Sequence, residues 1–419
     1  MAFQQGLSGL NAASKALDVI SNNVANGSTV GYKMANAQFG DAFAAAMNGA
    51  AAGVQIGIGT SMSQVSQQFN QGNITPTNNP LDVAINGDGF FIVQSPDASL
   101  NGYSRNGQFD IDSRGYIVNA TGYKLMGFLP GGGSTTAAPI QLSASNSSLT
   151  GAPKQTSTMS IGINLDSRNT APVISPFDYT DPKTYNSSTA STSYDSLGNP
   201  HAVTMYFVRS SAAPALAGAA SRWDVYTSVD NGAPSAVPTN MEFNSAGTMV
   251  GTSAVNNYSM PVNFPVTTGA TSPMAFNINF SGSTQYGSPF NVTTQNQDGY
   301  APGTLSGITI SKDGIVQGRY SNGQTTDIAT IALATFSSPN GLLSMGSNLW
   351  AESAESGQVQ LGAPGIGKRG LLQAGAVEES NVDLTAELVN MITQQRNYQA
   401  NAQSIKTQDS VMQTLVNLR

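Results

Sequence analysis

The stretch LVNMITQQRNYQANAQSIKTQDSVMQTLVNL, residues 388–418, contains neither Gly nor Pro and only three charged residues. Its apolar side chains recur at alternating spacings of three and four, which is the repeat of a helix that packs along one seam. Ser380 and Asp383 precede it and form a signal for a helix N-terminus. The sequence predicts a long C-terminal helix that needs a partner, because helical stability comes mostly from packing.

A second seam with the same spacing opens the chain, within residues 3–24. It stops at Asn26-Gly27, a frequent signal for the C-terminus of a helix. Both seams contain polar residues and few flanking charges, so neither helix should be very stable alone. We predict that the two helices pair as a coiled coil and also contact copies on neighbouring subunits, with a purely intramolecular pair as the alternative. The predicted interface residues are Phe3, Leu7, Leu10, Leu17, Ile20, Val24, Leu384, Leu388, Met391, Tyr398, Ile405, Met412 and Val416.

The composition excludes several classes of partner and site. The net charge is −7, and 17 basic residues are spread thinly over 419 positions, so no basic surface for nucleic acid is expected. The chain has no cysteine, which rules out disulfides and Cys-ligated metals. The N-terminus lacks the pattern of a cleaved secretory signal, and no apolar run is long enough to predict insertion into a membrane.

Short runs rich in β-branched and aromatic residues fill residues 72–369, and turn signals such as NGDG, DSRG and SVDNG separate them. Asn-Gly and Asp-Gly supply the positive φ angles of tight hairpins. We therefore expect a mostly β fold with terminal α-helices. It divides into a terminal helical coiled-coil domain (1–26 and 381–419), a connecting segment (27–71 and about 362–380), a discontinuous inner β domain (72–150 and 292–361) and an inserted outer β domain (151–291).

Three motifs invite a chemical interpretation. GAPGIGKRG, residues 362–370, resembles a phosphate-binding loop, but Arg369 stands where Ser or Thr should bind magnesium. DIDSRG, residues 110–115, begins like a calcium loop but lacks the later Glu ligand, so a hairpin turn is expected. His201 is the single histidine, which excludes a His-based metal cluster within one chain. Trp223 and Trp350 are expected to be core aromatics. The sequence predicts neither an enzyme nor a cofactor.

Four segments, taken in order, resemble the bacterial flagellar axial proteins, the family of rod and hook subunits. They are SGLNAASKALDVISNNVANGSTVGYK (8–33), TPTNNPLDVAINGDGFF (75–91), YSRNGQFDIDSRGYIVNATGYKLMGF (103–128) and EESNVDLTAELVNMITQQRNYQANAQSIKTQDSVMQTLV (378–416). The inserted segment, about 151–291, points to the hook branch, because rod subunits are shorter. The resemblance implies a structural subunit that polymerises into a curved, flexible tube and transmits torque as a universal joint.

The same resemblance implies export in an unfolded state by the flagellar type III apparatus and a location in the extracellular flagellum. The expected partners are further copies of the chain, rod and hook-filament junction proteins, the hook cap and the export apparatus. A distal rod subunit is the nearest alternative, and a nucleotide-binding enzyme that uses the loop at residues 362–370 is a remote one. Uncharged polar loops rich in Gly, Ser, Asn and Thr would suit contacts that must slide as the tube bends.

Overall fold

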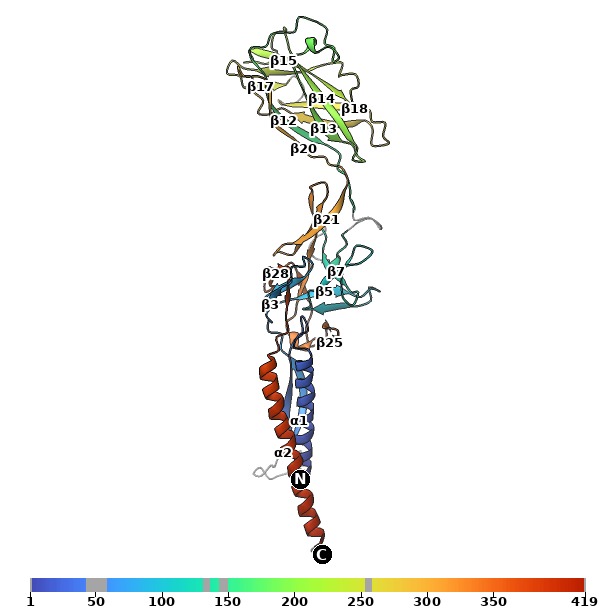
Figure 1. The fold of residues 1–419 in the computed structure, drawn as a ribbon, viewed down its shortest axis with the longest axis vertical. Coiled ribbons are helices and arrows are strands. Elements are labelled where there is room, and N and C mark those ends of the chain that lie inside the picture. Colours follow the sequence, from blue (N-terminus) through green and yellow to red (C-terminus); the bar gives the residue numbers. More distant parts are fainter. Residues whose placement is uncertain (1, 43–58, 131–135, 143–149, 253–257, 418–419) are drawn as a thin grey trace. The chain divides into compact units, whose positions relative to one another are not determined.

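The computed structural model describes residues 2–42, 59–130, 136–142, 150–252 and 258–417. The chain divides into two compact units: unit 1 consists of Met1–Leu149, Ser306–Arg319 and Thr325–Arg419, and unit 2 of Thr150–Leu305 and Tyr320–Gln324. Strands dominate both units, and a long helix lies at each end of the chain (Figure 1). The predicted class, mostly β with terminal helices, is confirmed.

The two terminal helices begin and end close to their sequence signals. Helix α1 spans Ala2–Ala25 and stops just before Asn26-Gly27. Helix α2 spans Leu384–Asn417. At its start, the Asp383 carboxylate accepts hydrogen bonds from the backbone N–H groups of Thr385 and Ala386, at 2.9 and 3.1 Å. Asp383 therefore acts as the N-cap, the position at which a side-chain oxygen satisfies N–H groups that have no partner inside the helix.

Helices α1 and α2 pack side by side in opposite directions within unit 1 (Figure 1). Gly27, just after α1, lies against Leu384 at the start of α2, and Gly6 near the start of α1 lies against Ile405 far along α2. The predicted pairing of the two chain ends is confirmed. A hairpin of β1 (Ala35–Ala42) and β2 (Gly59–Gln67) covers another side of α1.

The rest of unit 1 is a set of short antiparallel strands. Its main sheet has the order β21-β22-β23-β9-β5-β6-β26-β25, and β24 joins it through β5. Two small pairs, β28-β4 and β29-β3, lead to α2. The strands are β3 (Ile74–Pro76), β4 (Val83–Asn86), β5 (Phe90–Gln94), β6 (Asn101–Ser104), β7 (Phe109–Ile111), β8 (Ile117–Asn119), β9 (Lys124–Phe128), β10 (Ala138–Pro139), β21 (Gly303–Ile310), β22 (Ile315–Tyr320), β23 (Thr325–Ile331), β24 (Leu333–Thr335), β25 (Leu343–Gly346), β26 (Leu349–Ala351), β27 (Gln360–Gly362), β28 (Leu371–Ala374) and β29 (Ala376–Glu378).

This sheet joins segments that lie far apart in the chain. Strand β9 pairs with β23, and β5 pairs with β24, so residues before and after unit 2 share one sheet. Its core contains Phe90, Tyr103 and Trp350, whose rings meet each other or Phe336 edge to face. Edge-to-face contacts of this kind are favourable for aromatic rings. The two flanks therefore form one discontinuous β region.

Unit 2 is built from two antiparallel-rich sheets. A five-stranded sheet has the order β13-β14-β15-β16-β17, and a four-stranded sheet has the order β18-β19-β12-β20. The strands of these two sheets are β12 (Thr158–Asn164), β13 (Ser187–Tyr194), β14 (Pro200–Arg209), β15 (Ser221–Val229), β16 (Thr239–Phe243), β17 (Met249–Thr252), β18 (Ser259–Phe264), β19 (Met274–Asn279) and β20 (Asn291–Gln297). Strand β11 (Thr150–Gly151) pairs instead with Gly303 and Thr304 of β21, which also belong to unit 2. The sequence assigned residues 292–297 to the inner domain, whereas β20 lies in this sheet.

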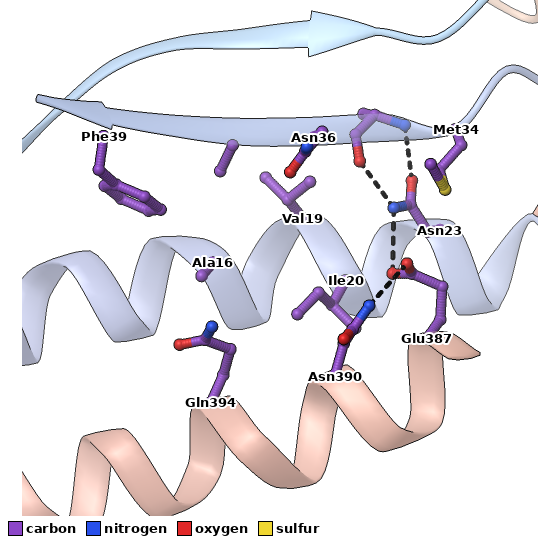
Figure 2. Close-up of a pocket in the computed structure, with 12 residues that line it drawn as sticks. Ala16, Val19, Ile20, Asn23, Met34, Asn36, Phe39, Glu387, Asn390 and Gln394 are labelled. Atoms are coloured by element: carbon purple, nitrogen blue, oxygen red, sulfur yellow. Dashed lines mark hydrogen bonds between the residues drawn. The ribbon is translucent and has the colours of Figure 1, made fainter. Parts of the chain in front are cut away.

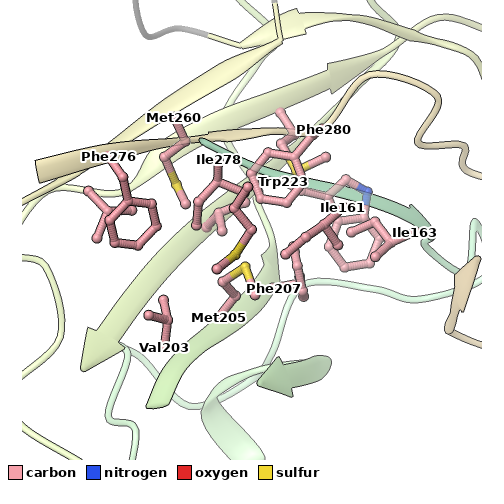
Figure 3. Close-up of a cluster of buried hydrophobic side chains, with 14 of the residues drawn as sticks. Ile161, Ile163, Val203, Met205, Phe207, Trp223, Met260, Phe276, Ile278 and Phe280 are labelled. Carbon is pink, nitrogen blue, oxygen red and sulfur yellow. The ribbon is translucent and has the colours of Figure 1, made fainter. Parts of the chain in front are cut away.

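The two sheets of unit 2 enclose a hydrophobic core (Figure 3). Alternate residues of β14, Val203, Met205 and Phe207, point inward and are fully buried. Trp223 on β15 joins them, as the sequence predicted for a core aromatic. Period-two alternation is what a strand with one buried face requires. Among the described residues of both units, no helix is long and apolar enough to cross a membrane.

Candidate functional site: the paired terminal helices

The contact between α1 and α2 runs along small residues of α1. Gly6, Gly9, Ala13 and Ala16 follow the same spacing of three and four that marks a helical seam, and Ala13 and Ala16 are buried. A Cβ placed on Gly9 would lie 2.9 Å from the Asn401 amide nitrogen. Small side chains let two helix backbones approach closely, so this row of residues, the small-residue seam, sets the distance between the helices.

The small-residue seam lies one residue away from the seam predicted on α1. Phe3, Leu7 and Leu10 were predicted to contact α2 or neighbouring subunits; within one subunit Phe3 and Leu7 are exposed and Leu10 is half-buried. The prediction followed the bulkiest apolar side chains. The two helices instead approach each other most closely at the smallest side chains of α1, because Gly6 and Gly9 leave space for Ile405 and Asn401 of α2.

A groove of about 340 Å³ opens where α1, α2 and β1 meet (Figure 2). Asn23 of α1 lies at one end of it, buried among the three elements. The Asn23 amide donates to the Ala35 carbonyl at 2.8 Å and to the Glu387 carboxylate at 3.2 Å. Its carbonyl oxygen accepts from the Ala35 N–H at 3.0 Å and from the Tyr32 hydroxyl at 3.1 Å. All four hydrogen-bonding positions of this side chain are thus occupied.

Glu387 is the acidic residue of this junction. It is buried, and besides Asn23 it accepts a hydrogen bond from the Asn390 amide at 3.4 Å. Burial raises the pKa of Tyr32, and the negative charge of Glu387 raises it further, so the Tyr32 hydroxyl stays protonated and can donate. The other lining residues are mostly apolar or neutral: Ala16, Val19, Ile20, Met34, Asn36, Phe39, Asn390 and Gln394.

A buried ion cluster joins the bases of both helices to the β region of unit 1. Lys33 follows α1 in the chain, Glu378 ends β29 before α2, and Arg105 follows β6. The Lys33 ammonium is 2.6 Å from one carboxylate oxygen of Glu378, and the Arg105 guanidinium is 3.2 Å from the other. We call these three residues the clasp.

The clasp is closed off from water on every side. The side chains of Lys33 and Glu378 are fully buried, and that of Arg105 is 3% exposed. Backbone groups complete it, because the Gly72 N–H donates to the Glu378 carboxylate at 2.9 Å and Lys33 donates to the Asn70 carbonyl at 2.6 Å. Burial lowers the pKa of Lys33 and of Arg105, and Glu378 opposes that effect in both cases. The carboxylate is therefore required to keep two cations inside the protein.

The predicted interface residues fall into three groups. Leu10, Leu17, Ile20, Val24, Met391 and Ile405 are half-buried. Val416 lies in α2, but its side chain is outside the described part of the structure. The others are exposed: Phe3, Leu7, Leu384, Leu388, Tyr398 and Met412. Their role in assembly stays a prediction.

Sequence reasoning missed the small-residue seam, Asn23 and the clasp. The small residues did carry a signal, because their spacing repeats that of the leucines one position away. Lys33, Arg105 and Glu378 carried none, because a single charged residue in a sequence is expected at the surface.

The motifs with a possible chemical role are turns. In the loop at residues 362–370, the Arg369 side chain folds back over Gly362 and donates to the Ala363 carbonyl at 3.2 Å. In the acidic motif, Asp112 accepts from the N–H groups of Arg114 and Tyr116, as in a hairpin turn. The described residues contain no group of three or more His, Cys, Asp or Glu that could hold a metal ion.

Comparison with protein families finds matches over most of the chain. Residues 3–33 match the flagella basal body rod protein family, and residues 84–166 match the D1 domain of flagellar hook protein FlgE/F/G. Residues 164–300 match the flagellar basal body protein FlaE D2 domain, and residues 373–418 match the C-terminal family of the flagellar basal body rod FlgEFG proteins.

Known proteins resemble the chain over its full length. The flagellar hook protein FlgE of Escherichia coli (strain K12) is 41% identical over 430 residues, covering 100% of both chains. That of Brucella suis biovar 1 is 32% identical over 100% of this chain and 98% of its own. Among solved structures, Helicobacter pylori flagellar hook protein FlgE2 has a similar fold, with a TM-score of 0.51 at 15% identity, over 73% of this chain and 100% of its own.

Proposed function

Because the chain belongs to the flagellar hook protein family, and is therefore a structural subunit of the hook rather than an enzyme, we propose that its paired terminal helices form the surface through which subunits polymerise. The hook assignment replaces the distal rod alternative, since relatives that match over the full length are hook proteins. The remote alternative, a nucleotide-binding enzyme, is set aside for the same reason.

The observation that carries this proposal is the amount of apolar surface left on the helices. In α2, Glu387 is the one buried side chain among residues 384–414, the described part. Leu388, Val389 and Ile392 near the start of α2 are exposed, although a helix with so little burial would not be stable in water alone. Neighbouring copies of the same helices supply the matching surface.

The end of α2 extends past the described part of α1. Because Gly6 lies against Ile405 and the helices run in opposite directions, the last two turns of α2 pass beyond the start of α1. Figure 1 shows this extension below the N-terminus. Val411 and Met412 on it are exposed. The predicted residues Met412 and Val416 would therefore contact another subunit rather than α1.

A matched pair of variants tests the proposal. Leu388→Ser removes an exposed apolar side chain from α2, and Leu100→Ser makes the same change at an exposed position of the β region. Burial of a leucine contributes about 1.5–3 kcal/mol, and 1.4 kcal/mol is a factor of ten. We expect Leu388→Ser to raise the critical concentration for polymerisation about tenfold or more, with unchanged circular dichroism of the monomer. Equal polymerisation of both variants would show that α2 is not the assembly surface.

We extend the proposal to the finer functions that the family implies. The tube would bend as a universal joint, and the low charge content, 10% of residues, would let loops of adjacent subunits slide without breaking strong ion pairs. Weak terminal helices suit a chain that is exported unfolded by the flagellar type III apparatus. The proposed location is the extracellular flagellum, with rod, hook cap and hook-filament junction proteins as partners. Curvature of polymers assembled at low and high salt tests the sliding contacts, since ion-pair contacts would make it salt-dependent.

A further inference from the structure

His201, the single histidine of the chain, lies between two carboxylates in unit 2. Its Nδ1 is 2.6 Å from a carboxylate oxygen of Asp230, and its Nε2 is 3.4 Å from a carboxylate oxygen of Asp195. A neutral imidazole has one N–H and can donate to one of these groups, whereas an imidazolium donates to both. The arrangement therefore stabilises the protonated ring.

Both carboxylates are fixed by the turns that carry them. Asp195 follows β13, is buried, and accepts from the N–H groups of Leu197 and Asn199 at 2.9 Å each. Asp230 follows β15 and is half-exposed, and its second oxygen accepts from the Ala202 N–H at 2.9 Å. Backbone N–H groups thus fix an oxygen of each carboxylate, and the ring lies between the two carboxylates.

The same cluster connects the two sheets of unit 2. Thr268, in the loop between β18 and β19, donates its hydroxyl to Asp195 at 2.7 Å. The Phe264 ring of β18 meets the imidazole edge to face, with centroids 5.5 Å apart. The charged groups that face His201 from the elements around it are Asp195 and Asp230, because Thr268 and Phe264 are uncharged.

We propose that Asp195, His201 and Asp230 form a proton-dependent latch, which holds the turns after β13 and β15 and the Thr268 loop together while the imidazole is charged. Loss of the proton leaves one carboxylate facing a ring nitrogen with no hydrogen, so that contact becomes repulsive. The turn after β13, the turn after β15 and the Thr268 loop then lose the contact that joins them at this end of the β-sandwich. The latch is a conformational device of unit 2, separate from the assembly surface of the terminal helices.

The pKa shifts follow from the same contacts. Burial lowers the pKa of His201, but the hydrogen bonds and charges of Asp230 and Asp195 outweigh it and raise the pKa above its ordinary value of 6.5. Burial raises the pKa of Asp195, but hydrogen bonds from Asn199, Thr268 and His201 outweigh it and hold the pKa well below its ordinary value of 3.8.

These directions define the pH range of the latch. A raised folded-state pKa contributes stability that is complete below pH 6.5 and is lost as the pH rises through the folded-state value. A lowered pKa, as for Asp195, contributes stability above pH 3.8 that is lost as the pH falls through its folded-state value. The latch is therefore strongest between pH 3.8 and 6.5 and opens on the alkaline side.

Nuclear magnetic resonance of the full chain, labelled with ¹³C at the histidine ring, tests the proposal, because one imidazole signal is expected. The wild-type signal should titrate with a midpoint above 6.5, and Asp230→Asn should return the midpoint toward 6.5. Asp224→Asn changes a carboxylate of β15, the strand that Asp230 follows, which pairs with Arg222 instead; it is the matched control and should leave the midpoint unchanged. A wild-type midpoint at or below 6.5, or a midpoint that Asp230→Asn does not lower, would overturn the latch.

Denaturant unfolding of unit 2 between pH 6 and pH 9 provides the second readout, followed by Trp223 fluorescence in a Trp350→Phe background. The denaturation midpoint of the wild type should fall as the pH rises, whereas His201→Gln should show a flat profile over the same range. If His201→Gln does not fold, Asp230→Asn is measured instead and should show a shallower slope than the wild type. Parallel profiles for wild type and variant would contradict the proposal.

Discussion

Unit 2 and the terminal helices bury their side chains in opposite ways. In unit 2, β14 alone contributes Val203, Met205 and Phe207 to the core, and none of the three is exposed. The β-sandwich therefore buries these apolar residues within one subunit. In the helices, Phe3, Leu388 and other apolar residues remain exposed, and the buried contact runs along glycines and alanines. The difference shows that unit 2 buries its own apolar residues, whereas the helices leave apolar surface exposed that the proposed assembly would cover.

The strongest test of this difference removes the helices. Deletion of residues 1–26 and 383–419 should leave a β-rich monomer that no longer polymerises, because the deleted residues carry the proposed assembly surface. Electron microscopy reports polymers, and circular dichroism reports the β structure. If the truncated chain still forms tubes, or if unit 2 unfolds, the helices are not the assembly surface or unit 2 is not stable by itself.

The clasp lies where the helices meet the β region, and its removal should destabilise unit 1 alone. Glu378→Gln leaves Lys33 and Arg105 buried without a carboxylate, and breaking a buried ion pair in this way costs about 3–5 kcal/mol. Trp350 fluorescence in a Trp223→Phe background measures the unfolding of unit 1. Glu355→Gln, at an exposed position, is the control and should change stability by less than about 0.5 kcal/mol. A clasp variant as stable as this control would show that the cluster is dispensable.

One pair of phenylalanines compares the two regions directly. Phe207 has 0% of its surface exposed and Phe3 has 53% exposed. Phe207→Ala should lower the free energy of unfolding of unit 2 by about 3–5 kcal/mol through the cavity it creates. Phe3→Ala should change monomer stability by less than about 1 kcal/mol but should weaken polymerisation. Denaturant titration and sedimentation distinguish the two effects. The contrast between the regions would disappear if both variants lost folding stability equally.

A substitution in the small-residue seam is expected to have the smallest effect on stability. Ala13→Leu inserts a larger side chain between α1 and α2, and overpacking of this kind costs about 1–3 kcal/mol. Hydrogen exchange of α1 amides measures the loss. Ala25→Leu adds the same side chain at the exposed end of α1 and serves as the control. Faster exchange in the control than in Ala13→Leu would mean that the seam does not set the helix distance.

Local signals predicted the helices and their ends well. Asn26-Gly27 and Asp383 act through backbone groups within a few residues, so a sequence contains all that is needed to recognise them. The inward alternation of Val203, Met205 and Phe207 was predictable for the same reason, because the period of a strand is local. The glycine-rich loop at residues 362–370 folds as a turn, as its Gly and Pro content favours.

Contacts between distant residues were not predictable. Lys33 and Glu378 are 345 positions apart, and nothing near either residue indicates that it is buried. The seam on α1 was placed one residue away because hydrophobicity identifies the residues that avoid water, whereas closest approach of two helices is decided by side-chain size. His201 lies near the start of β14, and its two carboxylate partners come from turns that only the folded sheet brings together.

The clasp would have a mechanical consequence in a subunit that transmits torque, as proposed above. Lys33 follows the first helix and Glu378 precedes the second, and their side chains meet at 2.6 Å. A pull on either helix would therefore reach the β region in part through one shared ion cluster. Shear between the helices would be shared through that cluster, so the two ends of the chain would act as one lever arm under load.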